Sequence, residues 1–327
     1  MLILTEKQVR SLLDDDDSVV LDVVRQTYVR HAAGKTVVPH SVFLRFGDDD
    51  RNRIIGLPAW VGGEEQAAGF KWVASFPGNL ARNMPRASAV MTLNSTRTGQ
   101  PEAFLAASAI SARRTGASAA LAAGVLAPDG VDRVLLVGCG VINFEVLRYL
   151  TSTCPDLRQV ALYDQDPGRA EVFGVRVEQA WPRLRCRTED DLGAAMGRHD
   201  LVSLATTATR PHMDASACRP GSVVLHVSLR DLTANSILGS RNVVDDADHV
   251  CRAGTSIHLA EQQVDNRDFI GPSIGELLAD GARHADPAAV TVVSPFGLGA
   301  LDVALAAEVC AQARAKGLGT WIDGFLS

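Results

Sequence analysis

The 327-residue sequence has few cysteines, few aromatic residues and only a small net charge. Its six cysteines form no CxxC pair and its histidines no HxxxH pair, so neither a zinc site nor a disulfide framework is expected. A net charge of −6 gives no electrostatic reason to expect a nucleic-acid or membrane partner. No apolar run approaches the roughly 18 residues of a membrane span, and the N-terminus does not resemble a signal peptide. We therefore expect a cytoplasmic protein with reduced thiols.

What is present is typical of a globular enzyme-sized chain. Hydrophobic residues make up 46% and charged residues 21% of the sequence, which excludes a disordered chain. Against a prior of about 150 residues per domain, the length predicts two domains.

The first third of the chain changes its hydrophobic period once. Residues 5–33 predict two helices, the first opened by the capping-box spacing of Thr5 and Gln8. The acidic run at 14–17 resembles a metal cluster, but a solvated loop between the helices explains it better. Residues 36–105 then predict a mostly antiparallel sheet, whose polar side chains could face a cleft. Its strands are expected at 42–46, 53–57, 69–75, 87–93 and 103–105, with turns at 47–50, 62–63 and 97–101.

A long alanine-rich helix over 106–126 leads into an alternation of strands and helices. Strands are expected at 131–137, 160–164, 201–205, 222–227, 243–245 and 290–293, with helices to about 152, over 168–180 and over 298–316. Such alternation predicts an α/β fold with a parallel sheet and helices on both faces.

A glycine-rich turn follows the first of these strands. Gly138 permits the tight turn, and Gly140 lets the backbone approach a pyrophosphate at the start of the helix that begins with Val141 and Ile142. Asn143 stands where a third glycine is usual, so the motif alone is only moderately specific. Asp164, at the end of the next strand, lies where an acid binds the adenine ribose and would repel a 2′-phosphate, which favours NAD over NADP. The competing interpretation is a glycine turn without a cofactor.

Two later turns are expected to line the same crevice, because ligands of open parallel sheets bind beyond the carboxyl ends of the strands. Thr206 and Thr207 follow one strand and Ser228 follows another. Asp231 lies where an acid could face the nicotinamide. From the residues alone, a loop aspartate that caps the next helix is at least as good an explanation.

Several segments, taken together, resemble the ornithine cyclodeaminase/μ-crystallin superfamily nearly from end to end. These are Lys71-Trp72, Pro85-Arg-Ala-Ser-Ala, Ser111-Ala-Arg-Arg-Thr-Gly-Ala-Ser-Ala, Val137-Gly-Cys-Gly and Ser294-Pro-Phe-Gly-Leu-Gly. The resemblance implies a Rossmann NAD-binding domain (117–299) inserted in an α+β domain for substrate binding and dimerisation (1–116 plus 300–327).

Four segments most resemble one branch of the family, the N-(2-amino-2-carboxyethyl)-L-glutamate dehydrogenases. They are Phe70-Lys-Trp with Ser75-Phe-Pro-Gly-Asn, Pro85-Arg-Ala-Ser, Gly138-Cys-Gly-Val-Ile-Asn-Phe-Glu and His226-Val-Ser-Leu-Arg-Asp-Leu. The branch implies NAD-dependent release of L-2,3-diaminopropionate and 2-oxoglutarate, for siderophore or other natural-product biosynthesis. It also implies a homodimer, with a complex with an upstream synthase left open.

The resemblance implies roles for individual residues. Lys71 and Arg114 would bind the substrate α-carboxylate, Asp231 would act in catalysis, and Thr115 would contact the cofactor phosphates. The alternatives are ordinary ones. A lone lysine on a strand is commonly solvent-facing, and Arg113-Arg114 would commonly be a solvated helix face.

Two departures from the family pattern bear on the substrate. Cyclodeaminases carry a glutamate where this chain has Ile55, and a position that is commonly threonine holds Arg86. Losing an acid and gaining a cation suits a substrate with additional carboxylates, and Arg45 offers a further contact. We therefore expect Arg45, Arg86 and Arg114 to favour a tricarboxylate amino acid over ornithine. The alternatives are ornithine cyclodeamination, another amino- or imino-acid oxidoreductase, and a non-catalytic binding protein resembling μ-crystallin.

Overall fold

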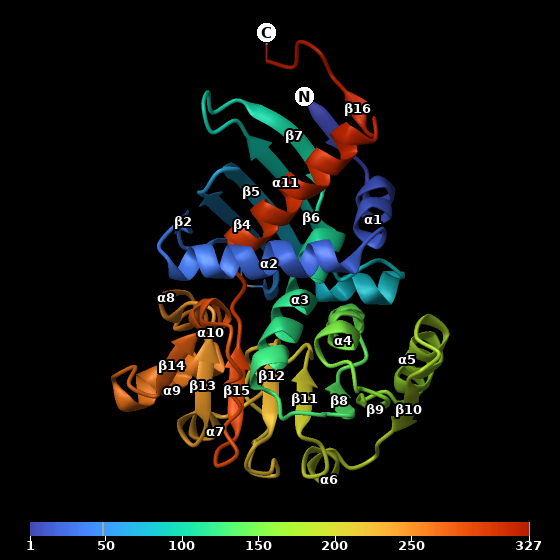
Figure 1. Ribbon diagram of the computed structural model, residues 1–327, viewed down its shortest axis with the longest axis vertical. Coiled ribbons are helices and arrows are strands. Elements are labelled where there is room, and N and C mark those ends of the chain that lie inside the picture. Colours follow the sequence, from blue (N-terminus) through green and yellow to red (C-terminus); the bar gives the residue numbers. More distant parts are fainter. Residues whose placement is uncertain (48, 327) are drawn as a thin grey trace. The chain divides into compact units, whose positions relative to one another are not determined.

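The computed structural model describes residues 1–47 and 49–326, with the side chains of 49–51 left out (Figure 1). The chain divides into two compact units, Met1–Arg114 with Leu298–Ser327 and Thr115–Gly297. These limits differ by two residues from the expected 1–116 plus 300–327 and 117–299. The boundary at Arg114 falls inside helix α3 (Ser108–Leu126).

The first unit is built on an eight-stranded, mostly antiparallel sheet in the order β16-β1-β7-β6-β5-β4-β2, with β3 paired to β4. Its strands are β1 (Leu2–Leu4), β2 (Thr36–Val37), β3 (Val42–Phe46), β4 (Asp49–Val61), β5 (Ala67–Ser75), β6 (Ala87–Asn94), β7 (Pro101–Ala106) and β16 (Thr320–Trp321). The expected strands are all present. Of the turn expected at 47–50, Gly47 is a turn residue with φ +57°, whereas Asp49 and Asp50 already belong to β4; residue 48 lies outside the described residues.

Helices cover one face of this sheet. They are α1 (Glu6–Asp14), α2 (Asp17–Ala32) and α11 (Gly299–Ala315), with a short 3₁₀ turn η1 (Pro77–Arg82) after β5. The capping box of Thr5 and Gln8 is present at the start of α1. Helix α11 packs on β4, β5 and β6 and against α2, and Figure 1 shows it crossing these strands. The last helix of the chain therefore completes a core that its first hundred residues begin.

The second unit contains an all-parallel sheet in the order β10-β9-β8-β11-β12-β15-β13-β14. Its strands are β8 (Arg133–Val137), β9 (Gln159–Tyr163), β10 (Arg185–Thr188), β11 (Leu201–Leu204), β12 (Val223–His226), β13 (Arg241–Val244), β14 (Ile270–Ser273) and β15 (Thr291–Ser294). The short edge strands β10 and β14 were not anticipated, because half-exposed segments of four residues carry little periodicity.

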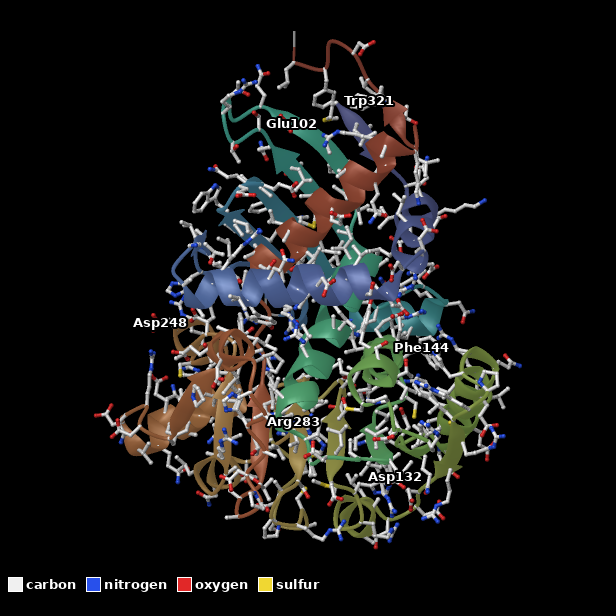
Figure 2. The ribbon with its side chains drawn as sticks, in the orientation of Figure 1. Glu102, Asp132, Phe144, Asp248, Arg283 and Trp321 are labelled. Atoms are coloured by element: carbon white, nitrogen blue, oxygen red, sulfur yellow. The ribbon has the colours of Figure 1, made fainter. Side chains whose placement is uncertain are left out.

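The helices of this unit alternate with its strands. They are α4 (Val141–Thr153), α5 (Pro167–Ala180), α6 (Leu192–Met196), α7 (Ala234–Leu238), α8 (Ala247–Val250), α9 (Ser256–Val264) and α10 (Ile274–Asp280). Phe144 of α4, labelled in Figure 2, packs edge-on against Phe173 of α5 and lies close to Trp181. The central strands β11, β12 and β15 are buried along their whole length, as expected where both faces of a parallel sheet are covered.

The strand order of this sheet reverses its direction once, between β8 and β11. The chain passes from β8 outward to β9 and β10, then returns to the other side of β8 with β11. Loops that leave β8 and β11 therefore diverge, which is the position where open α/β sheets bind ligands. None of the helices in the described part of the chain is long and apolar enough to cross a membrane.

Candidate functional site

Three charged side chains meet in the interior of the first unit. Lys71 on β5 donates from Nζ to Oδ2 of Asp302 on α11, at 2.6 Å, and to Oγ of Ser111, at 3.2 Å. Arg114 on α3 donates from Nε to Oδ1 of the same aspartate, at 3.1 Å. All three charged groups are buried, Asp302 completely. Two cations share one carboxylate, so the cluster carries a net positive charge that suits one further carboxylate.

Burial and pairing act against each other in this cluster. Burial lowers the pKa of Lys71 to about 8, although the neighbouring Asp302 opposes that shift. For Asp302, burial alone would raise the pKa, but the charges and hydrogen bonds of Arg114 and Lys71 outweigh it and hold the pKa below its usual range. Asp302 was not anticipated, because one aspartate within an alanine-rich helix carries no motif. What marks Asp302 is its burial, because α11 places this acid on the side that packs against the sheet.

The solvent-facing interpretations of Lys71 and of the Arg113-Arg114 pair were wrong. Arg113 is buried and pairs with Asp14 and, at 2.8 Å, with Asp17. The acidic run at 14–17 is thus partly exposed, as predicted, but two of its carboxylates also hold Arg113 at the junction of α1 and α2. No cluster of metal-ligating side chains occurs within the described residues.

The other expected arginines lie at one end of the same sheet. Arg45 on β3 is exposed and lies beside the Phe43 ring, with 5.9 Å between its guanidinium carbon and the ring centroid. Arg86, just before β6, is half-buried and donates from Nη1 to Ser75 Oγ at 2.9 Å. The three arginines expected to act together thus come from β3, from the residue before β6 and from α3.

The glycine turn of the second unit has the features that a bound pyrophosphate needs. Gly138 has φ +90°, and a side chain there would come within 2.6 Å of the Ala205 carbonyl oxygen. Gly140 is the N-cap residue of α4, has no capping side chain, and has open space where a Cβ would project. The first N–H groups of α4, from Val141 and Ile142 onward, are thus available to an anion.

Asn143 serves the turn in a different way from a third glycine. Its Nδ2 donates to the carbonyl oxygens of Val137 and Gly138, at 2.9 and 2.8 Å, and its Oδ1 accepts from Ser203 Oγ at 2.7 Å. The side chain therefore ties the end of β8 to β11. Asp164 directly follows β9 and accepts from the Cys139 backbone N–H at 2.8 Å, which places its carboxylate beside the glycine turn. These residues fit an adenine dinucleotide, the residues that would hold it being Gly138, Gly140 and Asp164.

A second carboxylate of this unit lies beyond the ends of β11 and β12. Asp231 is completely buried, and its two oxygens accept from the hydroxyls of Thr206 and Ser228. Between Ser228 and Asp231, Leu229 adopts φ +68°, which is uncommon for a residue other than glycine. The capping explanation for Asp231 was wrong, because Thr233 caps α7.

His226 completes the surroundings of Asp231. Its Nε2 lies 3.1 Å from the Asp231 backbone nitrogen and 3.4 Å from Asp231 Oδ2, and its Nδ1 lies 3.5 Å from Ser294 Oγ. Burial lowers the pKa of His226, although the neighbouring Asp231 opposes that shift. Burial alone would raise the pKa of Asp231, but its contacts with His226, Ser228 and Thr206 outweigh it and lower the pKa to about 2. Asp231 is therefore a charged carboxylate at neutral pH.

The remaining expected cofactor residues differ in their exposure. Thr207 is exposed, and Thr115 is half-buried near the middle of α3. Asp245, which no motif indicated, is buried after β13 and accepts from the backbone N–H groups of Phe296 and Gly297, at 2.9 and 2.6 Å. It holds the Ser294-Pro-Phe-Gly segment that the sequence singled out.

Comparison with known families decides where this chain belongs. The model of the ornithine cyclodeaminase/mu-crystallin family matches residues 2–317. The chain belongs to this family. The resemblance seen in the sequence is thereby confirmed.

Among curated relatives in the family, N-((2S)-2-amino-2-carboxyethyl)-L-glutamate dehydrogenase of Staphylococcus aureus is 26% identical over 99% of this chain and 98% of its own length. Of solved structures, CmnK is 29% identical with a TM-score of 0.90, covering 100% of this chain and 99% of CmnK. An archaeal alanine dehydrogenase dimer with bound NAD is 28% identical with a TM-score of 0.87, covering 99% of each chain. These structures confirm the expected α/β fold with a nucleotide-binding Rossmann unit.

Proposed function

We propose that this protein is an NAD-dependent dehydrogenase that converts N-(2-amino-2-carboxyethyl)-L-glutamate to L-2,3-diaminopropionate and 2-oxoglutarate. The observation that carries the proposal is the pair of complementary charged clusters. Lys71 and Arg114 outnumber their shared Asp302 and suit a carboxylate, whereas Asp231 is a buried anion that suits a cationic nitrogen. An amino acid carries both partners on one carbon.

The coarser part of this assignment rests on the relatives. The expected oxidoreductase activity and the NAD cofactor are confirmed by family members that are dehydrogenases of amino acids and by the NAD-bound alanine dehydrogenase. The choice of substrate is our proposal, supported by the likeness over nearly the whole chain to the Staphylococcus aureus enzyme.

Each residue has a role that its surroundings support. Lys71 and Arg114 would bind the α-carboxylate of the glutamate part and so orient its Cα–H for transfer. NAD⁺, when bound, accepts that hydride. Asp231 would stabilise the positive charge that develops on the substrate nitrogen as the imine forms, a task for which a permanently charged carboxylate is suited.

Water must then add to the imine carbon, and the carbinolamine collapses to 2-oxoglutarate and diaminopropionate. Asp231 would orient this water and accept its proton as the new C–O bond forms. Thr206 and Ser228, which donate to its two oxygens, would hold the carboxylate in place.

The decisive experiment mixes the protein with NAD⁺ and N-(2-amino-2-carboxyethyl)-L-glutamate, follows NADH absorbance, and identifies products by mass spectrometry. We expect NADH together with 2-oxoglutarate and diaminopropionate. A parallel reaction contains ornithine. Proline and ammonia from ornithine alone would instead indicate a cyclodeaminase that works without an acid at Ile55. NAD binding without turnover of any amino acid would favour a binding protein.

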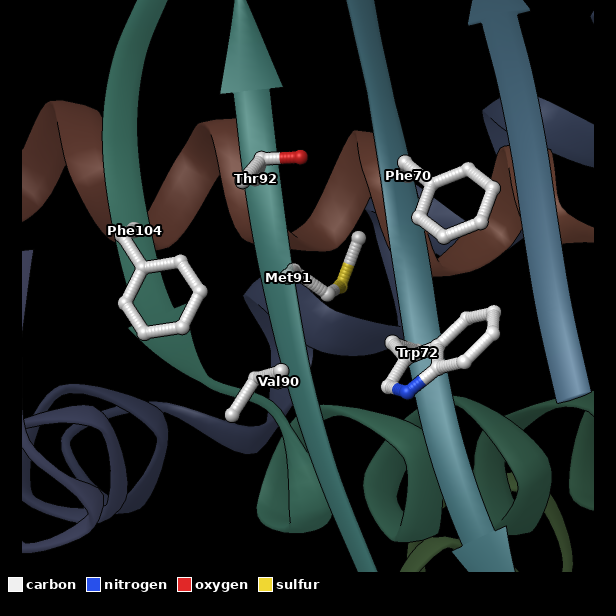
Figure 3. Close-up of a pocket in the computed structure, with 6 residues that line it drawn as sticks. All are labelled: Phe70, Trp72, Val90, Met91, Thr92 and Phe104. Carbon is white, nitrogen blue, oxygen red and sulfur yellow. The ribbon is translucent and has the colours of Figure 1, made fainter. Parts of the chain in front are cut away.

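We further propose that the protein is a homodimer in the cytoplasm. One sheet face of the first unit is apolar and partly exposed, with Phe70 and Trp72 on β5, Val90 and Thr92 on β6 and Phe104 on β7 (Figure 3). A second copy of this chain would cover it, as the alanine dehydrogenase relative is a dimer. The described cysteines are all free thiols, in keeping with a reducing compartment.

The dimer has a direct test. Sedimentation velocity should give twice the mass of the chain, and Phe104→Glu should shift the protein toward monomer, since a charge at an apolar interface is left unpaired. The control is Lys316→Glu, a change of charge at the C-cap residue of α11. A wild-type monomer would remove the proposal.

The diaminopropionate would feed siderophore or other natural-product assembly, and any complex with the synthase that supplies the substrate can be tested by co-purification.

A further inference from the structure

Three arginines form a row across neighbouring strands of the first unit. In the register of the sheet, Arg45 on β3 lies opposite Arg53 on β4, and Arg53 lies opposite Ser75 on β5. Ser75 in turn lies opposite Ala87 on β6 and accepts a hydrogen bond from Arg86. The row thus joins three cations at one end of the sheet, and Arg53 is its middle member.

Arg53 and Arg86 have few polar partners among the described residues. The Nε of Arg53 is shielded from solvent and has no hydrogen-bond partner among the described residues. No described carboxylate forms an ion pair with Arg53 or Arg86. Burial, together with the charges of Arg45 and Arg86, lowers the pKa of Arg53, and burial lowers the pKa of Arg86. Both remain cations at neutral pH, because a guanidinium group keeps its proton far above that pH.

This arrangement contrasts with the buried arginines of the unit. Arg113 pairs with Asp14 and Asp17, and Arg114 pairs with Asp302. Arg53 and Arg86 are half-buried, and a cation that is partly removed from water is stabilised by a carboxylate partner. No carboxylate of the described residues supplies one to either, so these two arginines are suited to an anion that is not part of the chain.

Arg53 also shares a sheet face with the cation cluster described above. Lys71 and Ser75 are four residues apart on β5, and their partners on β4 are Leu57 and Arg53. Residues separated by an even number along a strand point to the same face, and four residues span about 13 Å. One ligand with carboxylates at both ends can therefore contact Lys71 through one of them and Arg53 through the other.

We propose that Arg53, supported by Arg86, forms a second carboxylate subsite, which binds the side-chain carboxylate of the glutamate part of the substrate. The inference rests on the proposed function for the identity of that substrate. Arg53 is then a specificity-determining residue that selects dicarboxylic over monocarboxylic amino-acid moieties. From the sequence, Arg45, Arg86 and Arg114 are the arginines expected to select the substrate by its carboxylates, and Arg53 is not among them.

The test compares two substrates in three proteins. The substrates are N-(2-amino-2-carboxyethyl)-L-glutamate and its norvaline counterpart, in which a methyl group replaces the side-chain carboxylate. Wild type should prefer the first by about 10²-fold in kcat/KM, the size of one bidentate arginine–carboxylate contact. Arg53→Met should reduce the preference to below about tenfold, through KM, with little change for the norvaline compound. Arg53→Lys should retain part of it.

The matched control is Arg97→Met, an exposed arginine in the turn between β6 and β7 of the same unit. Equal losses on both substrates in Arg53→Met, or none on either, would overturn the subsite. If Arg53→Met does not fold, the same comparison is made with Arg53→Lys alone, and an unchanged preference overturns the proposal.

A binding measurement separates this inference from the proposed function. Calorimetry in the presence of NADH compares 2-oxoglutarate with 2-oxovalerate, which lacks the second carboxylate. If wild type turns over neither amino acid, the proposed function fails. The subsite still stands if wild type prefers 2-oxoglutarate and Arg53→Met loses that preference, and it falls if wild type binds the two equally.

Discussion

Asp302 in the first unit and Asp231 in the second are both completely buried carboxylates, yet they retain their charge by different means. Asp302 is neutralised by Lys71 and Arg114, so its surroundings are positive overall. Asp231 is instead held by the hydroxyls of Thr206 and Ser228 and lies beside His226. The first arrangement suits an anion, and the buried carboxylate of the second suits a cation.

The largest effect that distinguishes the two aspartates is expected from removing the charge of Asp302. Asp302→Asn removes the charge of the carboxylate that Lys71 and Arg114 share, and we expect the free energy of unfolding to fall by about 3–5 kcal/mol. Urea titration measures this, with Asp22→Asn on the exposed side of α2 as the control. A decrease below about 1 kcal/mol would show that the two cations do not depend on Asp302. Adding Lys71→Met should restore part of the loss, because fewer unpaired charges remain.

Removing the charge of Asp231 should affect turnover instead of stability. Asp231→Asn preserves size and removes the negative charge that stabilises the developing imine, so kcat should fall by about 10²-fold to 10³-fold. The Kd for NAD⁺, from fluorescence titration, should stay within about twofold, because the residues at the glycine turn are unchanged. Asp156→Asn, exposed after α4, is the control. Turnover close to wild type would assign the charge stabilisation to another group.

The smallest expected effect is a pH dependence, which should arise from the Lys71 cluster and not from the Asp231 cluster. Lys71 has a pKa of about 8 in the folded protein, below its ordinary value of 10.5, so it loses its proton as the pH rises through 8. Substrate carboxylate binds the protonated form, so KM should rise by up to about tenfold per pH unit above 8.

The lowered pKa of Lys71 weakens substrate binding at alkaline pH, but it stabilises the folded protein there. Between pH 8 and 10.5 the unfolded chain binds more protons at Lys71 than the folded protein, so this residue makes unfolding less favourable as the pH rises. Lys71→Arg should abolish the alkaline rise in KM, since arginine stays charged. Asp231, with a pKa near 2, should contribute no change in this range. A KM that is flat to pH 10 in wild type would exclude Lys71 as the carboxylate ligand.

The parts of the site that the sequence revealed are those encoded by short contiguous patterns. Gly138, Gly140 and Asp164 follow apolar strands at a spacing that predicts a nucleotide turn, and the structure places them together. Asp231 was correctly located beyond its strand, although capping was an equal explanation until Thr233 was seen to cap α7. In a parallel sheet the ligand-binding residues lie at strand ends, where turn chemistry marks them.

Residues that act from the face of the antiparallel sheet left no such mark. Asp302 is distant in sequence from Lys71 and Arg114, and an alternating strand does not indicate which of its two faces a late helix will cover. Arg53 was passed over for a related reason, because its significance depends on the register that sets it between Arg45 and Ser75.

The sequence by itself determined the α/β class, the Rossmann nucleotide turn and the family, because hydrophobic period and glycine spacing are local properties of the chain. Only the tertiary structure decided which charges are paired. It brought Asp302 from the last long helix to Lys71 and Arg114, and it set Arg53 between Arg45 and Ser75. The physical reason is that the energy of a buried charge depends on its neighbours in space, and those neighbours come from segments far apart in the chain.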